Sequence, residues 1–287
     1  MEESKSINRL KNKLIKELPF FPNEKKTLEE LESKNINEVV IHYLHWQTRQ
    51  VPARIRTVHR APELTSDKRY KTLKEDINSL LDKVRNGESL HPFLSHRAHQ
   101  KGYTPVQRVK DGEVDGWEDK DQILNTKGFH HFHLDMTLEQ SGLSKRTNEV
   151  LFAFVDRKSF HAIAIFDHSV FEQSDASGSM TDERKRMWDV HEKYATLGMK
   201  PGSVYMNNPI MTSGHPLYLI RLADHYTRII LEIDPRLGER EFVNNIYKEA
   251  NLEPPSKFNL DWHLEGLDLG ILDKKNNVFF SVKQGHL

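Results

Sequence analysis

Residues 129–136 alternate between apolar side chains and side chains that can carry a proton, and this alternation predicts a β-strand with two different faces. Successive side chains of a strand point to opposite sides, so His131, His133 and Asp135 would share one face. The opposite face would be apolar and would be built by Phe132, Leu134 and Met136. Such a strand places protonatable groups on a surface that is anchored in a core, as an acid–base site requires.

Two apolar runs after this strand predict that it belongs to an antiparallel sheet. Residues 150–156 and 160–166 are rich in aromatic and branched residues, and only the polar stretch Arg157 to Ser159 separates them. Runs of this length around a short polar stretch are typical of a β-hairpin. His168 follows the second run, so we expect it to join the two histidines of the first strand.

The chain before the sheet has the apolar spacing of helices. That spacing predicts helices in residues 6–18, 27–32, 37–46 and 70–85, with Gly87 as the stop of the last. An extended basic segment lies between the third and fourth helices. Residues 107–128 have little apolar periodicity and predict a surface turn region.

The chain after the sheet mixes both types of element. It predicts helices around 187–197 and 239–251, strands at 204–206, 217–222 and 228–234, and a hairpin in 267–282 that turns at 274–277. We therefore predict an α+β protein with a helical N-terminal region, a central antiparallel sheet that bears the histidine cluster, and a C-terminal α/β segment. The predicted division is a basic helical region, 1–110, and an α+β domain, 111–287.

The charges of the chain cancel overall but are unevenly distributed. The 287 residues include 42 Lys and Arg against 42 Asp and Glu, whereas residues 1–110 carry 22 basic against 14 acidic residues. The basic first half could attract a polyanion, and we take Arg54, Arg56, Arg97 and Lys101 as candidate substrate-binding residues. Association between oppositely charged halves of two copies, a homo-oligomer, explains the asymmetry equally well.

The absence of cysteine limits the available chemistry. It excludes disulfides, thiolate metal sites and cysteine nucleophiles, and it fits a reducing cytoplasm. No apolar run approaches the roughly 18 residues of a membrane span. These features predict a soluble cytoplasmic protein with no membrane partner.

Acid–base catalysis without a cofactor is the first interpretation of the histidine cluster. One imidazole would withdraw a proton from a nucleophile and another would donate one to the leaving group. RNA suits this chemistry because its 2′-hydroxyl is the nucleophile, so the protein supplies only a base, an acid and a cation such as Arg146 or Arg97. The sequence therefore predicts an endoribonuclease with RNA as its partner.

Two alternatives stay open at this point. A His-x-His pair on a strand, completed by His168, would give the three-ligand set His131, His133 and His168 of a hydrolase or nuclease that depends on zinc or another divalent metal. The other alternative is a binding or regulatory protein without enzymatic activity, in which the histidines only form hydrogen bonds in a half-buried sheet.

The order of elements in residues 129–168 resembles the sheet of the RelE-like toxin endoribonucleases. In that family, successive antiparallel strands carry basic and histidine residues that cleave RNA without metal. The resemblance implies that Arg146 steadies the scissile phosphate, that His168 acts as an acid or base, and that His131 and His133 lie on the active face. For such an endoribonuclease we expect a toxin–antitoxin or antiviral-defence setting, with an antitoxin or another protein as partner. The chain is much longer than those toxins, so its flanking regions would need a function of their own.

Overall fold

The structure is a computed structural model that describes residues 3–95, 98, 100, 102–105, 121–172 and 178–287. The chain forms two compact units, each discontinuous in sequence. Unit 1 contains residues up to 48, those from 211 to the end, and the described part of 97–119, and unit 2 contains the described residues of 49–96 and 120–210. The predicted boundary at residue 110 lies outside the described residues, so the division into 1–110 and 111–287 stays a prediction.

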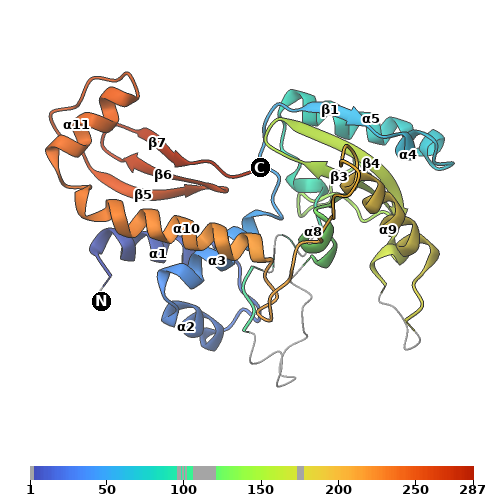
Figure 1. Cartoon of the computed structure of the whole chain (residues 1–287), viewed down its shortest axis with the longest axis horizontal. Helices are drawn as coiled ribbons and strands as arrows, with labels where there is room; N and C mark the ends of the chain where they lie inside the picture. Colours follow the sequence, from blue (N-terminus) through green and yellow to red (C-terminus); the bar gives the residue numbers. More distant parts are fainter. Residues whose placement is uncertain (1–2, 96–97, 99, 101, 106–120, 173–177) are drawn as a thin grey trace. The chain divides into compact units, whose positions relative to one another are not determined.

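Unit 2 is built around a four-stranded sheet with strand order β1-β4-β3-β2. The strands are β1 (Thr57–Arg60), β2 (His130–His133), β3 (Glu149–Val155) and β4 (Ser159–Asp167). β2 pairs with β3 and β3 pairs with β4 in antiparallel register, which confirms the predicted central sheet. β1 pairs in parallel with β4 at the edge of the sheet (Figure 1). This strand belongs to the segment that the sequence predicts to be extended and basic.

One face of this sheet carries the apolar core on which helix α9 (Asp182–Ala195) and the short 3-10 helix η2 (His168–Phe171) lie. Phe152 and Phe166 pack at its centre with their ring centroids 4.7 Å apart. Other buried residues of this core are Phe129, which directly precedes β2, and Val150, Ala164, Val170, Met187 and Val190. On the opposite face Phe132 packs against Phe160. Both faces of the sheet are therefore buried along the centre of β3 and β4.

Unit 2 also contains helices α4 (Pro62–Thr65), α5 (Tyr70–Asn86) and α8 (Gln122–Lys127), and the 3-10 helix η1 (His91–Phe93). The apolar stripe of α5 is buried, and the helix ends where Gly87 adopts a left-handed φ of 70°, as the sequence predicts. A side chain here would meet the backbone nitrogen of Ile55 at 2.9 Å, so glycine is required for both conformation and space. α8, in contrast, lies where a turn region was predicted.

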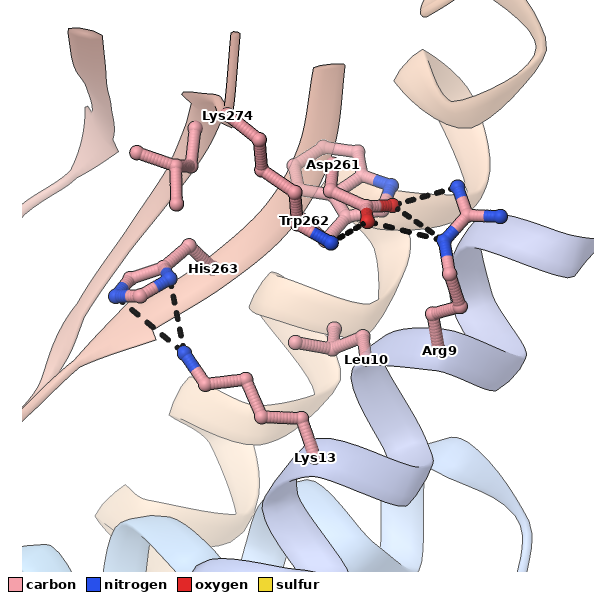
Figure 2. A pocket seen from close by; sticks show the side chains of 8 residues that line it. Arg9, Leu10, Lys13, Asp261, Trp262, His263 and Lys274 are labelled. Carbon is pink, nitrogen blue, oxygen red and sulfur yellow. Dashed lines mark hydrogen bonds and ion pairs between the residues drawn. The ribbon is translucent and has the colours of Figure 1, made fainter. Parts of the chain in front are cut away.

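Unit 1 combines helices with a second sheet. Its helices are α1 (Lys5–Glu17), α2 (Lys25–Ser33), α3 (Ile36–Gln47), α10 (Leu217–Ile233), η3 (Asp234–Arg236) and α11 (Arg240–Glu249). The sheet is antiparallel and consists of β5 (Leu260–Glu265), β6 (Asp268–Asp273) and β7 (Val278–Lys283). α3 packs against α1 and α10, and α1 also packs against β5, where the two elements border a cavity (Figure 2). The predicted hairpin that turns at 274–277 is confirmed, and β5 is an additional strand.

The predicted strands at 217–222 and 228–234 are wrong, because both segments belong to the single helix α10. Its buried residues Leu219, Ala223, Tyr226 and Ile230 follow helical spacing, and the helix packs this stripe on α3. The many branched residues suggested strands, but packing against a second helix overrode that propensity. The predicted strand at 204–206 is also absent, since this segment is exposed coil.

The described residues thus confirm the α+β class with a helical N-terminal region. Within the described ranges no helix has both the length and the apolar character needed to cross a membrane.

Candidate active site

The structure brings His131, His133 and His168 together in unit 2. His131 and His133 lie on the same side of β2 and pair with Phe152 and Val150 of β3. Paired residues share a face and these two belong to the apolar core, so the prediction of a separate polar face is wrong. β4 ends beside the start of β3, and η2 then turns so that the His168 ring lies 5.8 Å from the His133 ring, measured between centroids. Two segments that are 35 positions apart in sequence therefore place their imidazoles side by side.

His131 contacts a carboxylate that the sequence reasoning missed. Its Nδ1 lies 3.3 Å from Oδ2 of Asp121, while its ring packs against Phe171 and Phe152. Asp121 is the N-cap of α8 and accepts a hydrogen bond from the backbone nitrogen of Leu124 at 3.0 Å. The available signal was an aspartate directly before the short apolar segment of α8, which is a typical helix start.

The electrostatics favour an ionised Asp121. Burial alone would raise the pKa of this carboxyl, but its contact with His131 and the backbone hydrogen bond from Leu124 lower the pKa below its ordinary value. An ionised carboxylate beside Nδ1 orients the imidazole with its Nδ1–H toward Asp121, and it leaves Nε2 to act on a ligand.

His168 has the properties of a base at neutral pH. Burial lowers its pKa, and the positive charges of Arg146 and His131 lower it further, whereas a hydrogen bond with the Thr147 backbone and the Asp167 carboxylate act in the opposite direction. Its Nε2 is buried and has no hydrogen-bond partner among the described residues. The ring is therefore mainly uncharged near pH 7, with one nitrogen unused by the fold.

His133 is placed to support the site. Its side chain is buried, and its Nδ1 accepts a hydrogen bond from the backbone nitrogen of Thr147 at 3.3 Å. A backbone donor at Nδ1 places the ring proton on Nε2 in the neutral form. Thr147 Oγ1 also accepts from the backbone nitrogen of Leu134 at 3.3 Å, so the segment that carries Arg146 is tied to β2. Arg146 itself is exposed.

Asp135 does not share the face of the two strand histidines. The strand was predicted to extend through residue 136, but β2 ends at His133. The Asp135 carboxylate instead accepts a hydrogen bond from the backbone nitrogen of Thr137 at 2.8 Å in the following turn. Local turn formation thus removes Asp135 from the alternation, because aspartate readily bonds to backbone two residues ahead.

The candidate substrate-binding cations have different positions. Arg56 is buried, and it donates from Nε to the Asp156 carbonyl oxygen at 2.7 Å and from Nη1 to the Pro52 carbonyl oxygen at 2.8 Å. Its guanidinium is therefore used by the fold. Arg54 is half-buried in the same segment. Arg97 and Lys101 lie outside the described residues.

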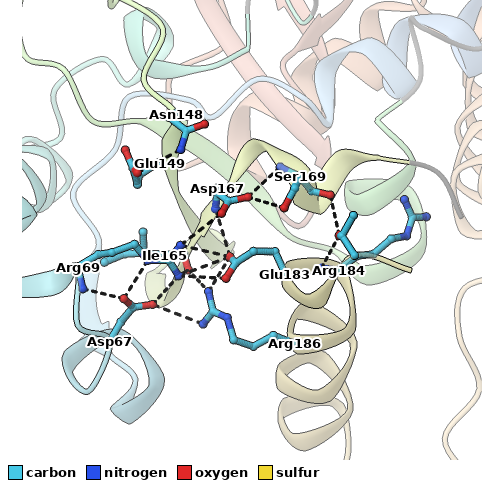
Figure 3. A network of polar contacts seen from close by, with 11 residues as sticks. Asp67, Arg69, Asn148, Glu149, Ile165, Asp167, Ser169, Glu183, Arg184 and Arg186 are labelled. Atoms are coloured by element: carbon cyan, nitrogen blue, oxygen red, sulfur yellow. Dashed lines mark hydrogen bonds and ion pairs between the residues drawn. The ribbon is translucent and has the colours of Figure 1, made fainter. Parts of the chain in front are cut away.

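A charged network fixes η2 at the sheet (Figure 3). Arg69 donates to Asp67 at 2.7 Å and to the Ile165 carbonyl oxygen at 2.9 Å, and it lies 3.4 Å from Glu183 of α9. Glu183 in turn accepts from the backbone nitrogen of Asp167 at 3.2 Å. The Asp167 carboxylate caps η2 through the backbone nitrogen of Ser169 at 2.9 Å. Since His168 lies between Asp167 and Ser169 in sequence, the network determines its backbone position.

A metal site would need at least three His, Asp or Glu side chains close enough to bind one ion. In the described part of the chain, no three His, Asp or Glu side chains are placed so that they could hold a metal ion, and this includes His131, His133 and His168.

The fold and site define an α+β protein with a histidine cluster on one face of a mixed sheet. Comparisons with protein-family models, with curated proteins and with solved structures find no match to this chain. The resemblance to the RelE-like toxins stays a prediction.

Proposed function

We propose that this protein is a metal-independent endoribonuclease whose site is the histidine cluster of unit 2. The observation that carries the proposal is that two imidazoles with different environments pack against the same ring, Phe171, with centroid distances of 4.9 Å for His131 and 5.5 Å for His168. His131 contacts a carboxylate, whereas His168 has a lowered pKa and an unused nitrogen. Different environments are what separates an acid from a base at a single pH.

The roles follow from these environments. A rotation of the neutral His168 ring exposes its buried Nε2, which accepts the proton of the RNA 2′-hydroxyl, and the 2′-oxygen then attacks the neighbouring phosphorus. His131, protonated on both ring nitrogens and oriented by Asp121, donates its Nε2 proton to the 5′-oxygen as the bond from phosphorus to that oxygen breaks. The products are a 2′,3′-cyclic phosphate and a free 5′-hydroxyl. The exposed guanidinium of Arg146 stabilises the charge on the phosphorane.

The proposed biological setting is a toxin or antiviral-defence component that acts on cytoplasmic RNA. This part of the proposal rests on the resemblance of residues 129–168 to the RelE-like toxins, and it includes a protein partner that restrains the activity.

The test is incubation of the purified protein with end-labelled single-stranded RNA, and with the same RNA carrying one 2′-deoxynucleotide at the cleavage position, each with and without a chelator. Cleavage should resist the chelator and stop at the 2′-deoxy position. His168→Asn and His131→Asn should each abolish it. His59→Asn is the matched control, because His59 lies on β1 of the same sheet and stacks on His161.

Other outcomes would reject the proposal in distinct ways. Chelator-sensitive cleavage would favour a metal-dependent nuclease. Cleavage that persists in both site variants would place the activity elsewhere. Intact RNA under all conditions, together with measurable RNA or protein binding, would favour the binding-protein alternative.

A further inference from the structure

The cavity in unit 1 is lined by side chains from a helix and a strand that meet (Figure 2). Arg9 and Lys13 are four residues apart on α1 and so project from the same side of the helix. Asp261 and His263 are two residues apart on β5 and so share one face of the strand. The cavity has a volume of ≈ 190 Å³, and it is also lined by Leu10, Trp262, Leu272 and Lys274.

One carboxylate in this cavity faces two cations. The Asp261 side chain is only 5% exposed, and it accepts hydrogen bonds from Nε and Nη2 of Arg9, the latter at 2.7 Å, and from Lys274. Burial would raise the pKa of Asp261, but the hydrogen bonds from Arg9 and Lys274 lower it below its ordinary value. The carboxylate is thus ionised and compensates one of these two positive charges.

The third cation faces a neutral partner. Lys13 Nζ lies 2.9 Å from Nδ1 of His263. An ammonium group has only donors, so Nδ1 accepts and the imidazole is uncharged. Burial and the charge of Lys13 both lower the pKa of His263, although Glu265 and Glu17 act in the opposite direction. Glu17, 3.7 Å from Lys13, is 40% exposed and does not line the cavity. The lining therefore carries three cations and one carboxylate, and two carboxylates outside the lining, Glu17 beside Lys13 and Asp234 near Arg9, offset part of this positive charge.

We propose that this cavity binds the phosphate group of a phosphate monoester. Such a group carries a charge of about −1.5 to −2 at pH 7 and three acceptor oxygens, which complement the three cationic donors Arg9, Lys13 and Lys274 of the lining. The volume is below the roughly 300 Å³ of a pocket for a drug-sized ligand, so the cavity accommodates the phosphate rather than a whole large molecule. The apolar lining of Leu10, Trp262 and Leu272 lowers the local dielectric and strengthens the attraction. The proposal is independent of the ribonuclease activity.

Inorganic phosphate is the probe, titrated calorimetrically into the full chain at constant ionic strength. All proteins carry Arg146→Ala, so that phosphate bound at the histidine cluster of unit 2 does not contribute. We expect saturable binding that Lys13→Ala weakens about tenfold or more, since a charge-assisted hydrogen bond is lost. Lys16→Ala is the matched control, because Lys16 is exposed on the same helix and does not line the cavity. Lys274→Ala provides a second, independent removal of a lining cation and should weaken binding as well.

Acetate, titrated in parallel, separates phosphate from carboxylate ligands and should bind at least tenfold more weakly. Three results would overturn the proposal. They are the absence of saturable phosphate binding, equal affinities of the Lys13→Ala and Lys16→Ala proteins, and an acetate affinity equal to that for phosphate. Circular dichroism spectra identical to those of the parent protein would confirm that each variant is folded.

Discussion

Asp121 Oδ2 lies 3.3 Å from His131 Nδ1, and this contact joins the cap of helix α8 to strand β2 of the unit 2 sheet. The carboxylate therefore serves two purposes, since it starts a helix and orients an imidazole. In the proposed mechanism the second purpose determines which nitrogen of His131 faces the substrate.

Asp121→Asn should separate these two purposes. Asparagine caps a helix about as well as aspartate, so the fold should be kept, but it removes the negative charge beside His131. We expect kcat for RNA cleavage to fall about 10²-fold or more, with KM changed little, because a correctly oriented general acid contributes about that factor. Steady-state kinetics on a short RNA, with thermal melting as the control for folding, would measure this. A kcat equal to that of the unmodified protein would show that Asp121 only caps α8.

Arg146→Ala should raise the pKa of His168. The positive charge of Arg146 is one of the causes that lower this pKa, so its removal should move the value upward. His168 must be neutral to act as the base, and the acid limb of the rate profile should therefore shift to higher pH. NMR titration of the His168 ring reports the shift without relying on activity. Lys145→Ala removes the adjacent exposed charge and should leave the His168 titration unchanged.

Because of His191, the stability of unit 2 should decrease as the pH is lowered from 7. This side chain is buried, and burial followed by the charge of Lys127 lowers its pKa from 6.5 to about 4. The unfolded chain therefore binds a proton between these values while the folded chain does not. The free energy of unfolding therefore has its full value above pH 6.5 and decreases as the pH falls toward 4. At pH 5 the decrease is about 2 kcal/mol. Chemical denaturation of the parent at pH 7 and pH 5, compared with His191→Gln, would measure the difference.

His191→Gln should be less stable at pH 7 but should show a smaller change between the two pH values. His225→Gln is the control, since His225 is exposed on α10 in unit 1. An equal pH dependence in the parent and His191→Gln would contradict the assignment.

The network around Arg69 should stabilise the fold far more than a surface ion pair does. Arg69→Met leaves the Asp67 carboxylate, only 6% exposed, without its bidentate partner, and Arg186 at 3.5 Å compensates it in part. We expect a loss of about 2 kcal/mol in the free energy of unfolding, somewhat below the range for a fully buried pair. Arg85→Met breaks the exposed pair with Asp82 and should cost less than about 1 kcal/mol. Equal losses in the two variants, measured by denaturant titration, would show that burial does not distinguish these pairs.

Local sequence patterns were sufficient to predict those elements whose form does not depend on distant parts of the chain. The shared face of His131 and His133 was predictable from the alternation of residues 129–134, and the hairpin of β3 and β4 was predictable from two apolar runs around a short polar stretch. The end of α5 at Gly87 was predictable for a similar reason, since glycine alone tolerates the left-handed backbone there.

Other features depended on contacts between distant segments. α10 carries branched residues that favour strands, and its burial against α3 made it a helix. Asp121 contacts His131 only because α8 and β2 fold together, and Arg9 meets Asp261 across 252 positions of sequence. The sequence by itself determined the hairpin of β3 and β4, the end of α5 and the shared face of His131 and His133, whereas the tertiary structure decided the form of α10 and which charges meet. The physical reason is that spacing specifies which way a side chain points along its own element, while its ionic partners, its burial and hence its pKa depend on other elements that pack against it.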